Sequence, residues 1–289
     1  MRTCYYHFAG ITMAVTMPRT MFYENEYRLA PFQTEAAEPD WSFIFTRKEV
    51  LSQPKGTLAA KCPGLHCYRD HDHSIRYIGV YSDDWTTADI RMEYSGRTGR
   101  GEVKNRQSDM RMPVKYVLEC MAVEHMIAQN RGFVFHCSYI DHGGKAILFT
   151  APSGTGKSTQ ADLWHTFRDA EIINGDRAAV RLKNGVLLAE GIPFAGSSEH
   201  CKNRSLPIEA IVYLEQATRT TIRKLGGYEA FSKIWEGVSV NTWDKTDMEL
   251  VSAVVQKTAV EIPIFNLTCT PDESAVIALE EALRKLVNQ

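Results

Sequence analysis

The sequence lacks both a charge excess of one sign and a long apolar run. Lys plus Arg number 33 and Asp plus Glu number 35, for a formal net charge of −2. Proteins that bind nucleic acid or membrane surfaces usually carry a basic excess or patch, so we expect neither partner. No stretch approaches the roughly 18 apolar residues of a transmembrane helix, so no membrane span is expected.

The sequence also has neither the cysteine pattern of a disulfide framework nor a good signal-peptide pattern. The seven cysteines are odd in number and scattered over 289 residues, which does not predict a disulfide framework. The apolar stretch of residues 1–15 is interrupted by His7 and Gly10, so it makes a poor signal peptide. These features favour a cytoplasmic protein.

What is present divides into two parts. Before residue 110 the chain has short runs of alternating apolar residues, typical of strands, separated by polar or glycine-containing turns. These runs are residues 5–17, 41–46, 74–81 and 87–94. Residues 95–109 are rich in glycine and arginine and predict an exposed loop. We therefore expect a smaller β-rich N-terminal domain over residues 1–110.

Residues 111–289 alternate between helical and strand patterns, which predicts an α/β nucleotide-binding core. Apolar spacing predicts one helix over 113–129 that ends at Gly132. Asn184-Gly185 predicts a tight hairpin within 178–188. The remaining expected strands are 133–140, 145–150, 170–174, 208–214 and 262–268, and the remaining helices are 158–167, 227–238, 243–259 and 272–287.

A glycine-rich loop lies between the strand 145–150 and the helix that follows it. Residues 151–158 nearly match the G-x-x-x-x-G-K-[ST] phosphate-binding pattern, with Ala151 at the first glycine. Gly154 and Gly156 let backbone amides turn inward around an anion, where a Cβ is expected to obstruct. Lys157 would reach the β- and γ-phosphates of ATP or another nucleoside triphosphate. The predicted nucleotide-binding residues are Ser153, Gly154, Thr155, Gly156, Lys157, Ser158 and Thr159.

A carboxylate follows the strand 170–174. Asp176 is placed where such folds hold Mg²⁺ or the attacking hydroxyl, and Ser158 would supply the second metal ligand. The alternative is a turn that only reverses the chain. Arg177 either neutralises the charge of the transferred group or solvates this turn.

His136 lies on the strand before the glycine-rich loop, where it would orient or tune the carboxylate of Asp176. The competing interpretation is a core histidine whose hydrogen-bonding groups are paired and which has no role in the site. The polar loop 196–204 offers His200, Lys202 and Arg204 for acceptor binding or charge stabilisation, or is simply solvated.

Together these segments resemble the HPr kinase/phosphorylase family, whose core is shared with ATP-dependent phosphoenolpyruvate carboxykinase. The resemblance covers about residues 130–289 and the smaller kinase-like paralogues fit best. It is carried by residues 136–138, 151–159, 174–177, 191–196, 206–216 and 262–267. By resemblance the fold is a P-loop core of the HPr kinase C-terminal type.

The resemblance also implies residue roles. The phosphate-binding lysine and the Mg²⁺-binding hydroxyl fall on Lys157 and Ser158, and the family histidine falls on His136. The family's two acidic residues fall on Gly175 and Asp176, so only one carboxylate is kept. Either Asp176 serves both roles or another acid supplies the second. Glu190 and Glu199 are the candidates for that second acid.

The resulting hypothesis is an ATP-dependent phosphotransferase acting on a serine-type hydroxyl. HPr kinase acts on a protein, and paralogues of this size occur beside ribosomally made peptide pathways, so a peptide or protein serine is favoured over a small molecule. A nucleotide-gated binding protein without catalysis is the alternative, and carboxykinase-like chemistry ranks lower. Because members of that family form hexamers and smaller assemblies, the resemblance is also consistent with a homo-oligomer.

Overall fold

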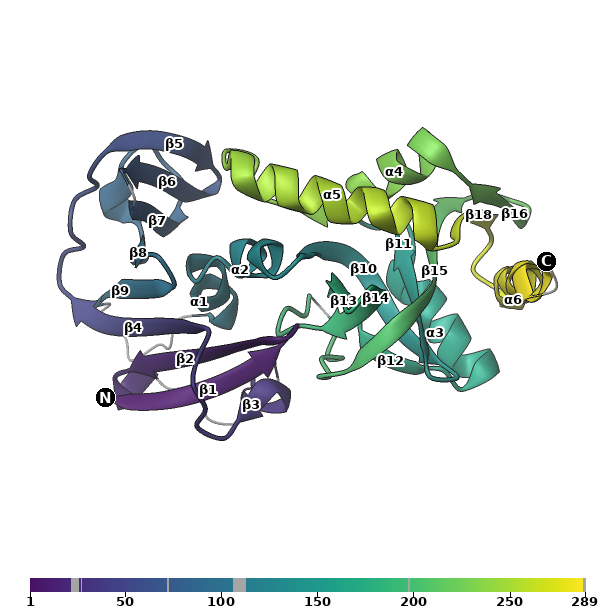
Figure 1. Ribbon diagram of the computed structural model, residues 1–289, viewed down its shortest axis with the longest axis horizontal. Coiled ribbons are helices and arrows are strands. Elements are labelled where there is room, and N and C mark those ends of the chain that lie inside the picture. The colour runs from purple at the N-terminus through teal and green to yellow at the C-terminus, as the bar shows by residue number, and fades with distance from the viewer. Residues whose placement is uncertain (22–25, 27, 72, 106–112, 197, 288–289) are drawn as a thin grey trace. The chain divides into compact units, whose positions relative to one another are not determined.

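The computed structural model describes residues 1–21, 26, 28–71, 73–105, 113–196 and 198–287. The fold is mixed α/β, and the described part of the chain contains six α-helices and two nine-stranded sheets. Contacts divide it into two compact units, Met1–Met126 and Ile127–Gln289. Figure 1 labels the elements of both units. No helix within the described residues is long and apolar enough to cross a membrane.

The first unit is built on one sheet whose strand order is β3-β1-β2-β4-β9-β8-β7-β6-β5. Its strands are β1 (Arg2–Phe8), β2 (Ile11–Met17), β3 (Gln33–Thr34), β4 (Trp41–Lys48), β5 (Thr57–Cys62), β6 (Gly64–Asp70), β7 (His73–Val80), β8 (Ile90–Ser95) and β9 (Thr98–Lys104). The predicted run 5–17 is therefore a hairpin of two strands. The four predicted strand-forming stretches all contain strands.

The expected exposed loop at 95–109 is wrong where the structure describes it. Residues 98–104 form β9, which pairs with β4 on one side and β8 on the other. Its glycines are packed rather than exposed. A Cβ on Gly99 would lie 2.6 Å from a ring carbon of Phe43, and one on Gly101 would lie 2.6 Å from a ring carbon of Phe45. Residues 106–109 of the predicted loop lie outside the described residues.

The single helix predicted over 113–129 is two helices, α1 (Val114–Cys120) and α2 (Val123–Gln129). Ala122 between them has a left-handed φ of 56°, which interrupts the helical hydrogen-bond ladder. Arg131 takes the left-handed conformation after α2, and Gly132 begins the next strand instead of ending the helix. Helix α1 packs on β7 and β8, so it belongs to the first unit.

The second unit has its own mixed sheet, with order β11-β10-β13-β14-β15-β18-β16. Its strands are β10 (Gly132–His142), β11 (Lys145–Thr150), β12 (Glu171–Asn174), β13 (Arg177–Lys183), β14 (Val186–Gly191), β15 (Ser205–Gln216), β16 (Thr221–Leu225), β17 (Val238–Ser239) and β18 (Ile264–Cys269). Strand β16 was not anticipated. The hairpin of β13 and β14 turns at Asn184 and Gly185, both with positive φ, as the sequence predicts.

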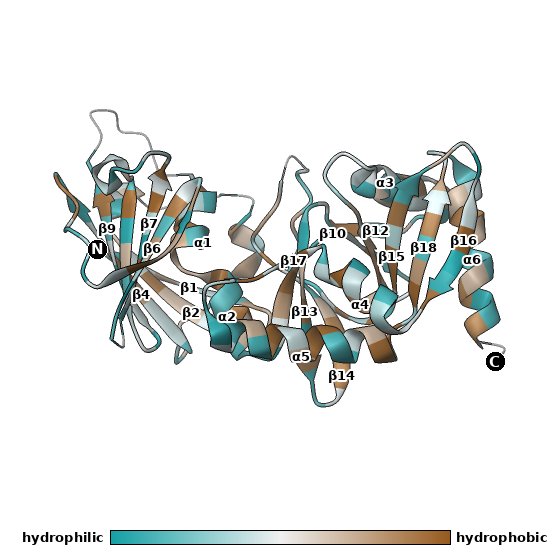
Figure 2. Cartoon of the chain, turned by 90° about the horizontal axis from the view of Figure 1, so that it is seen from above, coloured by the Kyte–Doolittle hydropathy of each residue, from teal (hydrophilic) through white to brown (hydrophobic). Residues whose placement is uncertain are grey.

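Helices cover both faces of this sheet. The remaining helices are α3 (Lys157–Arg168), α4 (Gly227–Trp235), α5 (Lys245–Glu261) and α6 (Glu273–Val287). One buried cluster joins the strands to α4 and α5, and another joins them to α3 and α6. The apolar colouring of β15 and β18 in Figure 2 reflects their position between the helical layers.

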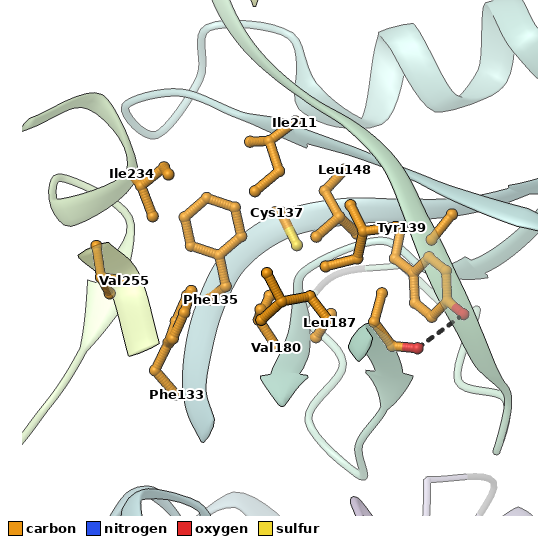
Figure 3. Close-up of a cluster of buried hydrophobic side chains, with 14 of the residues drawn as sticks. Phe133, Phe135, Cys137, Tyr139, Leu148, Val180, Leu187, Ile211, Ile234 and Val255 are labelled. Carbon is orange, nitrogen blue, oxygen red and sulfur yellow. Dashed lines mark hydrogen bonds between the residues drawn. The ribbon is translucent and has the colours of Figure 1, made fainter. Parts of the chain in front are cut away.

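Strand β10 alternates its side chains between the α4–α5 core and the other face. Phe133, Phe135, Cys137 and Tyr139 are all fully buried in this core. Figure 3 shows Phe135 beside Ile234, and the dashed line marks the bond that the Tyr139 hydroxyl donates to the Ala189 carbonyl, 3.2 Å long. The alternation leaves His136 directed away from this core.

The close fit of Gly101 beneath Phe45 gives a stability prediction for the first unit. Gly101→Ala should lower the free energy of unfolding by about 1–3 kcal/mol, because overpacking a filled core forces side chains from their rotamers. Phe45 is fully buried and has little room to move. The cost should shrink in a Phe45→Leu background, measured by chemical denaturation. An equal cost in both backgrounds would contradict the packing explanation.

Candidate functional site

The glycine-rich loop joins the carboxyl end of β11 to the first turn of α3. Gly154 and Gly156 have φ values of 80° and 116°, which side chains rarely adopt. A Cβ on Gly154 would meet no protein atom within 4 Å, and one on Gly156 would come only within 3.9 Å of Thr159. The left-handed backbone conformation is therefore what favours glycine at these two positions, and the predicted obstruction of a bound anion stays a prediction.

Lys157 is folded back against its own loop. Its Nζ donates hydrogen bonds to the carbonyl oxygens of Ala151, at 3.0 Å, and Pro152, at 3.3 Å. The residue is only 8% exposed, and burial lowers the pKa of its ammonium group. Ser153, Ser158 and Thr159 are exposed beside it. The ammonium group of Lys157 is therefore paired within its own loop.

The loop borders a pocket of about 440 Å³. Gly154, Thr155, Gly156 and Thr159 line one side of it, and the ends of β15 and β18 line the other. Gln216 at the end of β15 donates long hydrogen bonds of 3.4–3.5 Å to the carbonyls of Gly154 and Thr155. The loop therefore lies beside a hollow of the size that small-molecule ligands occupy in proteins.

His136 is held on β10 by its backbone. Its N–H donates to the Gly237 carbonyl at 2.8 Å, and its own carbonyl accepts a 3.0 Å bond from the Thr150 hydroxyl. Its Nε2 lies 3.7 Å from Oδ1 of Asp176, near enough for electrostatic contact but beyond a hydrogen bond. Burial lowers the pKa of His136, and the charge of Lys157 adds to this, while Asp176 opposes it.

Asp176 is positioned by a buried asparagine. Oδ1 of Asn174 accepts hydrogen bonds from the N–H groups of Asp176 and Arg177, at 2.9 and 3.0 Å. The amide nitrogen of Asn174 donates to the carbonyls of Ile192 and Phe194. In the sequence Asn174 was given no role of its own. An asparagine two residues before a carboxylate is typical of an Asx turn, but only the structure shows that this asparagine positions Asp176 and Arg177.

Arg177 faces the same carboxylate from the other side. Its Nε lies 3.4 Å from Oδ2 of Asp176, and its guanidinium stacks over the Phe194 ring, 5.3 Å from the centroid. The structure thus brings three predicted catalytic residues together, and Lys157 lies close enough to affect the pKa of His136. Their individual roles stay predictions.

The residue before Asp176 has no room for an acid in this arrangement. A Cβ on Gly175 would lie 2.3 Å from the Ser198 hydroxyl, so a side chain there would require the 191–201 segment to move. Within the described residues, neither Glu190 nor Glu199 forms a hydrogen bond or an ion pair with Asp176. Glu190 is buried and accepts two bonds from Arg181, at 2.7 and 2.8 Å, while Glu199 is exposed.

The polar loop 196–204 begins beside the carboxylate of Asp176, since a Cβ on Gly196 would come within 2.9 Å of its Oδ1, but its two cationic side chains form ion pairs elsewhere. Lys202 pairs with Glu171 at 2.7 Å, and Arg204 pairs with Asp141 at 3.1 Å. Asp141 and Glu171 are register partners toward the far end of β10, five residues beyond His136. A strand advances about 3.3 Å per residue, so these ion pairs lie roughly 16 Å along the strand from the histidine. His200 is exposed.

Comparisons with known proteins identify one family. Residues 101–271, more than half of the chain, match the family model described as SynChlorMet cassette protein ScmC. No curated protein matches the sequence. Among solved structures, the Hpr(Ser) kinase/phosphatase from Coxiella burnetii is 9% identical, with 54% of this chain and 93% of that chain covered and a TM-score of 0.34. That structural likeness is distant and carries no argument about function.

The electrostatics of the site predict the titration of His136. Its pKa should lie below 6.5, because burial disfavours the imidazolium, and Asp176→Asn should lower it further by removing the carboxylate that opposes the shift. NMR titration of the histidine ring protons measures both values. A pKa that rises in Asp176→Asn would show that the carboxylate does not act on His136.

The buried pair of Glu190 and Arg181 predicts a structural role for both. Glu190→Gln should cost about 3–5 kcal/mol of stability, since it leaves the arginine charge buried without its partner. Replacing both residues by apolar ones should cost much less. Thermal and denaturant unfolding measure these values. A Glu190→Gln variant of unchanged stability would instead return Glu190 to the list of candidate catalytic acids.

Proposed function

This chain belongs to the SynChlorMet cassette protein ScmC family, and we propose that it is an ATP-dependent phosphotransferase acting on a hydroxyl group. One observation carries the proposal. A glycine-rich loop with left-handed glycines and a buried lysine lies at the end of a buried strand, and a histidine–carboxylate–arginine cluster lies on the adjoining strands. Phosphoryl transfer requires both a phosphate cradle and a charged group near the acceptor.

In the proposed reaction the loop is a P-loop that holds the β- and γ-phosphates. The amides of the loop and the first turn of α3 provide partial positive charge, and Lys157 exchanges its two carbonyl partners for phosphate oxygens. This exchange replaces hydrogen bonds to neutral carbonyl oxygens with stronger bonds to anionic oxygens, in which both partners are charged. Binding of the triphosphate would therefore give the buried ammonium group of Lys157 an acceptor of opposite charge.

The residues present fit a magnesium ion. Ser158 and Asp176 offer hydroxyl and carboxylate oxygens, the donor type that Mg²⁺ prefers. When bound, the ion would neutralise charge on the phosphates. We propose this site from the chemistry of these two side chains.

Proton transfer falls to Asp176 in this scheme. The acceptor oxygen forms a bond to the γ-phosphorus, the bond from that phosphorus to the bridging oxygen breaks, and ADP leaves. The hydroxyl proton passes to the carboxylate of Asp176. The lowered pKa of His136 favours its neutral form near pH 7, and Arg177 holds the other carboxylate oxygen. Because Gly175 offers no second acid, one carboxylate would serve as both base and metal ligand.

The acceptor is best sought among the other products of the same cassette, because the family description names a cassette protein. A serine-bearing peptide or protein is the acceptor that we favour, and for the first unit we propose a role in binding this acceptor or in assembly. A small-molecule hydroxyl is the alternative within the same reaction class.

A second function is favoured by Gly175. The close approach of Ser198 to this position suits a protein that binds nucleotide and a partner without transferring phosphate. Tight ATP binding with no transfer to any cassette product would select this function over the phosphotransferase.

Variants of two site residues test the proposal. Lys157→Ala and Asp176→Asn should each reduce phosphoryl transfer from γ-labelled ATP by at least about 100-fold, because each removes charge that acts on the transferred group. Lys145→Ala is the matched control, since that lysine pairs with Glu209 at the opposite end of β11. Transfer that persists in both site variants would refute the assignment.

A further inference from the structure

The pocket beside the glycine-rich loop continues past the phosphate cradle to the edge formed by two further strands. Its far wall consists of residues at the ends of β15 and β18 and of Gln160 in the first turn of α3. Those residues are Gln160, Glu215, Gln216, Ala217, Cys269 and Pro271. Leu214 adds an apolar surface from within β15. The wall therefore combines apolar surface with two side-chain amides and one carboxylate.

Strand register explains why this pocket adjoins the loop. β11, β15 and β18 are parallel neighbours, with Thr150 beside Tyr213 and Gln216 beside Cys269. Their carboxyl ends therefore meet at one edge of the sheet, where α/β proteins bind ligands. The loop rises from β11, and the pocket extends along the edge over the two following strands. Two strand spacings amount to roughly 10 Å.

Among the described residues of the pocket wall, Gln160 carries a buried polar atom without a hydrogen-bond partner. Gln160 is 3% exposed, and its Nε2 donates to Sγ of Cys269 at 3.3 Å. Its Oε1 is buried and has no hydrogen-bond partner within the described residues. A buried acceptor that stays unpaired is costly, so such an atom in a ligand pocket indicates a donor on the ligand.

We propose that this pocket binds the base of the nucleotide and selects adenine through its exocyclic amine, which donates to Oε1 of Gln160. This inference rests on the proposed triphosphate site. A purine ring is larger than a pyrimidine and would fill more of the 440 Å³ pocket that Ala217 and Pro271 help to line. Guanine carries an oxygen acceptor where adenine carries the amine, so it would leave Oε1 unpaired. The donation from Gln160 to Cys269 orients the amide with its oxygen free.

Gln216 connects the two parts of the proposed site. Its side chain lines the pocket and donates to two carbonyls of the glycine-rich loop. Phosphate and base would thus bind on opposite sides of a single side chain. Gln160 itself lies three residues after Lys157 on α3, so one helical turn carries both proposed contacts.

Nucleotide analogues test the inference without any change to the protein. Calorimetric titration of the full chain with ATP, GTP and the triphosphate of purine riboside, which lacks the amine, should give a dissociation constant about 10-fold lower for ATP than for either analogue. In Gln160→Met the three values should converge. The control is Gln256→Met on the exposed side of α5, which should keep the wild-type preference. Equal affinities in the wild type, or tighter binding of GTP, would overturn the inference.

Inorganic tripolyphosphate separates this result from failure of the proposed function. Binding of tripolyphosphate that is lost in Lys157→Ala supports the phosphate cradle whatever the base preference. If tripolyphosphate binds in this way but the nucleotides do not differ, the adenine pocket alone is refuted. If neither tripolyphosphate nor ATP binds, the proposed function and the inference fail together.

Discussion

The backbone of His136 and Cys137 is the point on which the candidate site depends. The His136 N–H donates to the Gly237 carbonyl, and the Cys137 N–H donates to the Asp176 carbonyl at 3.1 Å. The Thr150 hydroxyl donates to the carbonyl between them. Three other segments of the chain, at Thr150, Asp176 and Gly237, are therefore tied to two residues of β10. Buried backbone groups must be paired, so these bonds fix where the histidine and the carboxylate lie.

The two faces of β10 have different roles, one in packing the core and the other in the candidate site. One side of β10 supplies Phe133, Phe135 and Cys137 to the core, and the other carries His136 toward Asp176. Burial raises the pKa of the Cys137 thiol well above its usual range, so that residue is a packing group rather than a nucleophile. Lys157 of the glycine-rich loop is likewise buried, and its ammonium group donates to the carbonyls of Ala151 and Pro152.

The sequence predicted those features that local chemistry determines. Strand, glycine-rich loop and helix followed from residues 145–167, and the β13–β14 hairpin followed from Asn184-Gly185, because each depends on neighbouring residues.

Strand β9 was missed because its glycines are explained by Phe43 and Phe45, more than 50 residues away. The break at Ala122 has no sequence signal, since alanine does not favour positive φ. The ion pairs of Lys202 and Arg204 likewise depend on distant acids. His136 and Asp176 were expected to lie close together, and their side chains are 3.7 Å apart. Their catalytic roles stay predictions, because the fold does not show a reaction.

The central claim is that the glycine-rich loop holds a triphosphate through Lys157. A crystal structure of the full chain with Mg²⁺ and a non-hydrolysable ATP analogue tests it most directly. The account predicts phosphates between the loop amides and the start of α3, with Nζ of Lys157 moved from the carbonyls of Ala151 and Pro152 onto a phosphate oxygen. A bound analogue whose phosphates lie elsewhere, with Lys157 still on those two carbonyls, would contradict it.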